Sequence, residues 1–129
     1  MENEQYNKIE EKVCNLNYLN EMMGGKKHLI IEIMDAFLKQ VPEELQAIED
    51  AINKTEYHII KNFTHTMKSS VSIMGISVLT PVLQEMEDLG GKSENMERIK
   101  QLNEKLKVIC SSAIKEIEIE KRNSAKLSE

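Results

Sequence analysis

Apolar residues recur at intervals of three and four along most of the chain, and this helical period constrains the fold more than any other feature. Glycine or proline interrupts the period at Gly24-Gly25, Val41-Pro42, Gly75 and Gly90-Gly91. No segment sustains the alternation of apolar and polar residues that predicts a strand. With 5 glycines and 2 prolines in 129 residues, the chain also has few of the breaks that an all-β fold requires. The sequence therefore predicts an all-α protein: an antiparallel four-helix bundle with one or two short additional N-terminal helices.

These breaks also predict the limits of the individual helices. Longer helices are expected over 26–40, 42–54, 56–74, 77–89 and 93–122, after an arm or short helix over 1–15 and a short helix over 16–23. Pro42 is expected to end a helix, because the residue before a proline is disfavoured in the α region. Thr55 and Ser93 are expected to be N-caps of the helices that follow them. The bundle domain is expected to cover 16–122, followed by a frayed tail over 123–129.

The composition excludes several classes of partner. The formal net charge is −5 and no basic run is longer than two residues, so nucleic acid is not expected as a partner. No stretch approaches the ~20 apolar residues of a membrane span and no signal peptide is recognisable, so no direct membrane insertion is expected. Cys14 and Cys110 lie within apolar periodicities, and we expect both to be reduced core thiols in a cytoplasmic protein.

The predicted helix over 56–74 carries the most informative group of polar residues. On a helix that turns about 100° per residue, His65 falls on the side opposite the apolar residues. Lys61 and Lys68 lie four residues before and three residues after His65, so both ammonium groups can reach the imidazole. Ser69 lies one turn beyond His65, where a long side chain would cover the ring. This arrangement suits a site that accepts an anion and is contacted by another protein surface.

At these residues the sequence resembles the histidine phosphotransfer (HPt) domain of multistep two-component phosphorelays. The family pattern is a histidine, one residue, an apolar residue, a lysine, a small residue, a serine, and a glycine ten positions after the histidine. In this chain the pattern is met by His65, Met67, Lys68, Ser69, Ser70 and Gly75. The resemblance extends with its register kept to 16–25, 37–42 and 83–87. The chain departs at Ser69, where many members have glycine, but serine is still small.

The resemblance implies a phosphocarrier of bacterial signalling, which does not turn over a small-molecule substrate. His65 would accept a phosphoryl group from the aspartyl phosphate of one receiver domain and pass it to another receiver. Lys68 would stabilise the phosphate, whereas Lys61 matches no fixed family position and is a candidate by spacing alone. The implied partners are response-regulator receiver domains or a hybrid sensor histidine kinase, and we expect the chain to be a monomer.

The sequence contains no nucleotide-binding loop and no acidic cluster typical of a Mg²⁺ site. We therefore expect no ATP site and no cofactor in this chain, with Mg²⁺ supplied by the partner receiver domain.

The same residues admit other interpretations. A lone histidine on a charged helix face is most often only a solvated residue, and a helical adaptor of the same fold could bind a partner without any chemistry. An autokinase dimerisation domain would carry an acidic residue directly after the histidine, where this chain has Thr66. His58 and His65 are seven residues apart, whereas metal-binding helices more often place histidines four apart near a carboxylate. Ser70 and Gly75 are interpreted as structural.

Overall fold

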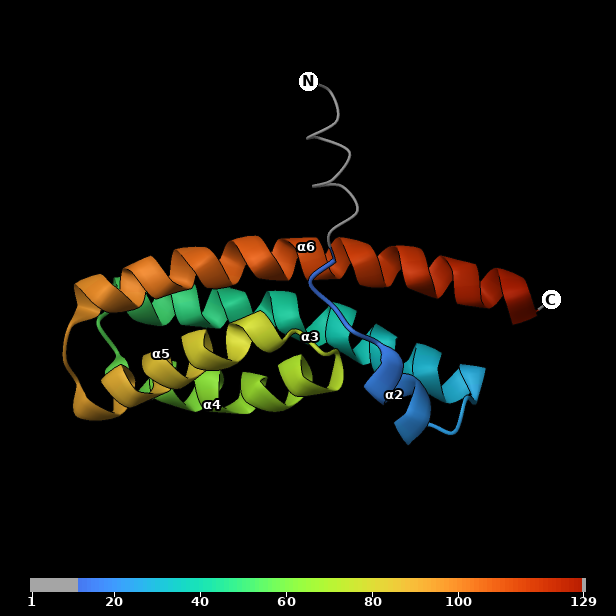
Figure 1. Cartoon of the computed structure of the whole chain (residues 1–129). Helices are drawn as coiled ribbons and strands as arrows, with labels where there is room; N and C mark the ends of the chain where they lie inside the picture. The colour runs from blue at the N-terminus through green and yellow to red at the C-terminus, as the bar shows by residue number, and fades with distance from the viewer. Residues whose placement is uncertain (1–11, 129) are drawn as a thin grey trace, which may run out of the picture.

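The computed structural model describes residues 12–128 as a bundle of helices. The elements are α2 (Asn17–Met22), α3 (Lys27–Asn53), α4 (Tyr57–Ile73), the 3₁₀ turn η1 (Ser77–Leu79), α5 (Thr80–Lys92) and α6 (Met96–Ser128). Figure 1 shows α3, α4, α5 and α6 running antiparallel to their neighbours, with α2 beside the N-terminal part of α3. No strand occurs in this part of the chain, and the predicted four-helix bundle is confirmed. Most of the predicted N-terminal arm over 1–15 lies outside the described residues.

One core joins the four long helices. It is built almost entirely from aliphatic and methionine side chains, which fill irregular gaps well. Burial of each large side chain contributes about 1.5–3 kcal/mol. The side chains that are buried at the centre include Met34, Phe37, Val41, Ile48, Ile60, Met67, Val71, Leu83, Met86, Ile99, Leu106, Cys110 and Ile117.

α3 runs through Pro42 without a break, so the prediction of two separate helices over 26–40 and 42–54 was wrong. Proline inside a helix removes one hydrogen bond, here to the carbonyl of Leu38, at a cost of about 3 kcal/mol or more. The ring of Pro42 lies on the exposed side of the helix. Phe37, Val41 and Ile48 are buried on the inward side, so the apolar period continues across the proline. Core burial on both sides of Pro42 offsets the local loss.

Thr55 ends α3 and is not the N-cap of α4, contrary to the prediction. Its φ is +56°, a left-handed conformation, and its N–H donates to the carbonyl of Ile52 at 3.1 Å. The next N–H, that of Glu56, donates to the carbonyl of Ala51 at 2.8 Å. These bonds satisfy the last carbonyls of α3. Glu56 takes the N-cap position of α4 without a capping side-chain hydrogen bond.

Gly90 lies within α5, so the prediction that Gly90-Gly91 ends this helix was wrong. A Cβ atom at Gly90 would lie 3.0 Å from the backbone nitrogen of Lys61 and 3.0 Å from the carbonyl oxygen of Tyr57. The glycine therefore permits close approach of α5 to the first turns of α4. This contact holds the two helices side by side where the polar face of α4 begins.

The connection from α5 to α6 also differs from the prediction. Ser93 has a φ of +54° and ends α5, so it is not the N-cap of α6. That position belongs to Asn95, whose Oδ1 accepts a hydrogen bond from the backbone N–H of Arg98 at 3.2 Å. α6 extends to Ser128, beyond the predicted end at Arg122.

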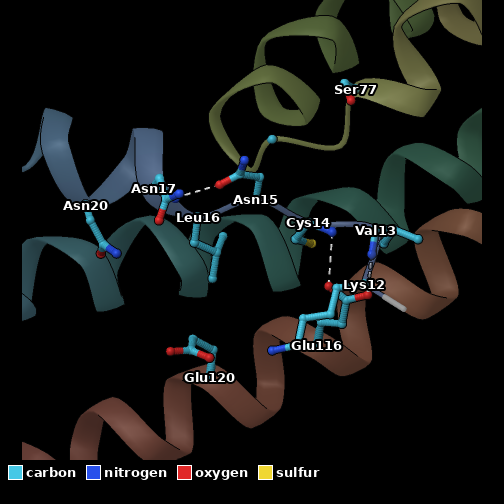
Figure 2. Close-up of a pocket in the computed structure, with 11 residues that line it drawn as sticks. Lys12, Val13, Cys14, Asn15, Leu16, Asn17, Asn20, Ser77, Glu116 and Glu120 are labelled. Atoms are coloured by element: carbon cyan, nitrogen blue, oxygen red, sulfur yellow. Dashed lines mark hydrogen bonds between the residues drawn. The ribbon is translucent and has the colours of Figure 1, made fainter. Parts of the chain in front are cut away.

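The segment before α2 is fastened to the bundle by backbone hydrogen bonds (Figure 2). The N–H groups of Val13 and Cys14 donate to the two carboxylate oxygens of Glu116 on α6, at 2.7 and 3.0 Å. The N–H of Asn15 donates to the carbonyl of Met74 at 3.1 Å, just after α4. Gly75, which follows, ends α4 with a φ of +65° and lies against Asn15, as its structural interpretation implied.

Both cysteines are free thiols, as predicted. Cys110 is fully buried and Cys14 partly buried. Burial raises the pKa of each thiol to about 12, so both are neutral at physiological pH. Within residues 12–128, no helix is both long and apolar enough to cross a membrane.

Candidate functional site

His65 lies at the middle of α4 on the face that points away from the core. The side chain is 66% exposed, whereas Thr64 and Met67 on the opposite face are buried. Thr64 satisfies its buried hydroxyl by donating to the carbonyl of Ile60 at 2.8 Å. The helical period thus presents the imidazole to solvent from a rigid, well-packed helix.

Glu87 on α5 joins His65 to Lys68. The Nδ1 atom of His65 lies 2.8 Å from Oε2 of Glu87, and the Nζ atom of Lys68 lies 2.8 Å from Oε1 of the same carboxylate. The side chain of Glu87 is only 15% exposed. The hydrogen bond from Lys68 lowers the pKa of Glu87 below its usual value, and the bond from His65 adds to this effect. The carboxylate is therefore ionised at neutral pH and holds both side chains.

The hydrogen bond to Glu87 also determines which nitrogen of His65 is free. An ionised carboxylate only accepts hydrogen bonds, so Nδ1 must carry the proton. In the neutral imidazole the lone pair then lies on Nε2, and no described residue bonds to that atom. In that neutral form, Nε2 is the nitrogen available as a nucleophile, while Nδ1 is held by Glu87.

Lys68 is held beside the ring by a short polar network along α5. Besides Glu87, its ammonium group donates to Oε1 of Gln84 at 3.0 Å. The amide of Gln84 in turn donates to Asp88 at 3.0 Å. The side chain of Lys68 remains 30% exposed. A cation is therefore positioned within reach of a group bound to the imidazole.

Ser69 is exposed and borders a shallow groove of about 410 Å³ beside Lys68. Across the groove, the side chains of Tyr18 and Met22 on α2 are 55% and 41% exposed. Ser72 and Ile73 complete its lining. The face around the imidazole is thus open and partly apolar, which suits contact with another protein.

Lys61 takes no part in the hydrogen bonds that join His65, Glu87 and Lys68. Its side-chain carbons lie against Gly91, where a Cβ atom would be 3.7 Å from Cδ of the lysine. None of the described acidic groups forms a salt bridge with Lys61. His58 is exposed on the same helix, and no group of three or more potential metal ligands occurs among residues 12–128.

A family model for the Hpt domain matches residues 32–116, well over half of the chain. The protein belongs to the Hpt domain family. It is a histidine phosphotransfer protein of a phosphorelay, a phosphocarrier that works with receiver domains and kinases.

The fold of this Hpt domain is similar to a crystal structure of histidine-containing phosphotransfer protein B (HptB) from Pseudomonas aeruginosa PAO1. The TM-score is 0.78 with 17% sequence identity, over 85% of this chain and 95% of that chain. At this identity the likeness establishes the shared fold. Among curated proteins no relative matches.

Glu87 is a residue of the site that the sequence pattern of this Hpt domain does not reveal. The stretch 83–87 was part of the family resemblance, but Glu87 is 22 residues from His65 and lies on another helix. In α5 the residues Leu83, Met86 and Gly90 face the core. Their period leaves several polar residues on the flanks of α5, and only helix packing decides which of them meets α4.

Proposed function

We propose that this Hpt domain carries the phosphoryl group on His65, accepting it from the aspartyl phosphate of one receiver domain and passing it to another. The observation that carries the proposal is the exposed imidazole whose Nδ1 is held by Glu87 at 2.8 Å. This contact occupies Nδ1 and leaves Nε2 of a side chain that is 66% exposed free to attack an incoming phosphorus atom.

In the forward step, the Nε2 lone pair attacks the phosphorus of the acyl phosphate. The bond between phosphorus and the aspartyl oxygen breaks, and its electron pair stays on the aspartate. In-line transfer of this kind depends on positioning and on neutralising the phosphoryl oxygens. Lys68 is the candidate for neutralising the phosphoryl oxygens, because Glu87 and Gln84 hold its ammonium group on the same face as His65. Lys61 is a weaker candidate, since its side chain lies over Gly91.

The groove beside Ser69 is the proposed contact surface for the receiver domain. The exposed side chains of Tyr18 and Met22 offer apolar area, and Ser69 is too small to hold the partner away from the imidazole. The receiver can belong to a response regulator or to a hybrid sensor histidine kinase, and we place the exchange in the cytoplasm. The residues assigned to the chemistry come from α4 and α5 of one chain, so a monomer suffices. We expect the receiver to bring the Mg²⁺ ion and assign no residue here to a cofactor.

The test is phosphotransfer from a labelled, phosphorylated receiver to the parent, His65→Gln and His58→Gln. His58 is the matched control, because it is an exposed histidine on the same helix. We expect acid-labile, base-stable label on the parent and on His58→Gln, and none on His65→Gln, with the helical circular dichroism unchanged in all three. Label that persists on His65→Gln would place the acceptor elsewhere. A receiver that binds the parent but never labels it would indicate a non-catalytic adaptor.

A further inference from the structure

We propose that Glu116 on α6 is a positioning residue for receiver binding, because it holds the segment that sets the place of α2. The inference rests on the proposed function, since α2 forms one side of the groove assigned to the receiver domain. The segment, here called the strap, is residues 13–16, and it runs from beside α6 into α2 (Figure 1). Glu116 does not line the groove, so its effect on the receiver has to act through the strap.

The carboxylate of Glu116 binds two successive backbone groups of the strap. Oε2 accepts the N–H of Val13 at 2.7 Å, and Oε1 accepts the N–H of Cys14 at 3.0 Å (Figure 2). The next N–H, that of Asn15, donates to the carbonyl of Met74 at 3.1 Å. Three consecutive N–H groups are thus bound to two separate parts of the bundle, α6 and the end of α4. Because both oxygens of one planar carboxylate are used, the direction of the strap is fixed as well as its position.

The strap passes directly into α2 and sets the start of that helix. The side-chain Oδ1 of Asn15 accepts the N–H of Asn17, the first residue of α2, at 3.1 Å. A helix this short has little stability of its own, and among the six described residues of α2 only Leu19 is buried. At the other end of α2, a Cβ atom at Gly24 or Gly25 would meet no described atom within 4 Å. The place of α2 therefore depends on Leu19 and on the strap.

α2 also separates the receiver groove from a cavity. Tyr18 and Met22 line the groove on one side of the helix. Asn17 and Asn20 line a cavity of about 520 Å³ on the other side, together with the strap and residues of α6 (Figure 2). Side chains therefore do not fill the space between α2 and α6. The hydrogen bonds of the strap supply the support that close packing supplies elsewhere in the bundle.

Loss of the carboxylate should loosen the strap without disturbing the chemistry. In Glu116→Gln the amide keeps one acceptor oxygen, but its NH₂ group cannot accept a bond from the second backbone N–H. The receiver must then order α2 when it binds, and this ordering weakens binding. His65 and Lys68 lie on α4 and are held by Glu87 on α5. The maximal rate of transfer depends on these groups, whereas the receiver concentration at half-maximal rate, KM, depends on α2.

The experiment measures transfer from a phosphorylated receiver domain to the parent, Glu116→Gln and Glu120→Gln. Glu120 is the matched control, because it lies one turn further along α6, lines the same cavity and has no described hydrogen-bond partner (Figure 2). Each protein is also labelled with phosphoramidate, a small donor that needs no contact with α2. Nε2 of His65 attacks its phosphorus, the P–N bond of the donor breaks, and the nitrogen keeps the electron pair and leaves as ammonia after taking a proton from water.

We expect the KM for the receiver to rise about tenfold in Glu116→Gln, which is the cost of losing one good interface side chain, with the maximal rate unchanged. The KM of Glu120→Gln should be parental, because the same charge is lost without a bond to the strap. All three proteins should be labelled by phosphoramidate at the same rate and have the same helical circular dichroism.

A double-mutant cycle with Tyr18→Ala tests whether the effect passes through α2. Tyr18→Ala should raise the KM of the parent and have little further effect in Glu116→Gln, where α2 is already displaced. Additive effects, or a parental KM in Glu116→Gln, would overturn the role of Glu116. Slower phosphoramidate labelling of Glu116→Gln would also overturn it, because the substitution would then disturb His65 itself. A parent that takes no label from the receiver would overturn the proposed function and this inference with it.

Discussion

Substitution of Gly75 by alanine should destabilise the bundle much more than the same substitution at Gly24, although the two glycines have nearly the same backbone conformation. Their φ angles are +65° and +62°. A left-handed conformation costs a non-glycine residue about 1–2 kcal/mol, and both variants incur this cost. A Cβ atom at Gly24 would meet nothing within 4 Å, whereas one at Gly75 would lie 2.1 Å from the carbonyl oxygen of Asn15.

The additional cost at Gly75 follows from what Asn15 must do to relieve that contact. Ordinary van der Waals contact begins near 3.4 Å, so the segment that contains Asn15 has to move by more than an ångström. The movement breaks the hydrogen bond from Asn15 to Met74, worth about 0.5–1.5 kcal/mol, and strains the bonds to Glu116, which as charge-assisted bonds are worth about 1.5–3 kcal/mol. We therefore expect a loss of about 3–5 kcal/mol in Gly75→Ala and about 1–2 kcal/mol in Gly24→Ala.

The assay is urea denaturation followed by far-ultraviolet circular dichroism, with the free energy of unfolding extrapolated to water for the parent and both variants. The difference between the two variants isolates the contact with Asn15, because the left-handed strain cancels. An equal loss of stability in Gly75→Ala and Gly24→Ala would refute the reasoning. It would mean that the segment before α2 contributes nothing to the stability of the bundle.

Two further predictions concern the transfer rate from a phosphorylated receiver. Lys68→Ala should slow transfer about tenfold to a hundredfold, since a charge-assisted contact to phosphate is worth about 1.5–3 kcal/mol. Lys61→Ala should have a smaller effect. A Lys68→Ala protein that transfers at the parental rate would show that the lysine does not contact the phosphoryl group and only pairs with Glu87 and Gln84. Ser69→Gly and Ser69→Ala should keep transfer, whereas Ser69→Leu and Ser69→Arg should lose most of it with unchanged thermal melts, because a bulky side chain there separates the two proteins. Parental transfer in Ser69→Arg would move the contact surface elsewhere, and failure of Ser69→Gly alone would give the hydroxyl a chemical role.

The helical period of the sequence was sufficient to predict the bundle and the outward position of His65. A residue three or four positions away in a helix is a neighbour whatever the rest of the protein does. Lys68 and Ser69 could therefore be placed beside His65 before any tertiary contact was known. Gly24, Gly25 and Gly75 were also predicted as helix ends, and each has the left-handed backbone that glycine adopts without strain.

Local signals failed where packing between helices outweighed them. Pro42 predicted a break, but buried residues on both sides carry α3 through it. Thr55 and Ser93 looked like caps at the start of a helix, yet both end the preceding helix in a left-handed conformation. Gly90 looked like a stop, although its lack of a side chain serves the close approach of α5 to α4.

The clearest division between sequence and tertiary structure lies at the site. The sequence alone determined that an imidazole, an ammonium group and a small hydroxyl residue share one exposed helix face, because that relation needs only the geometry of a single helix. Only the tertiary structure decided that Glu87 holds both His65 and Lys68. That contact depends on the distance, rotation and offset of α5 against α4. These are determined by the packing of the whole core, and no local period in the sequence encodes them.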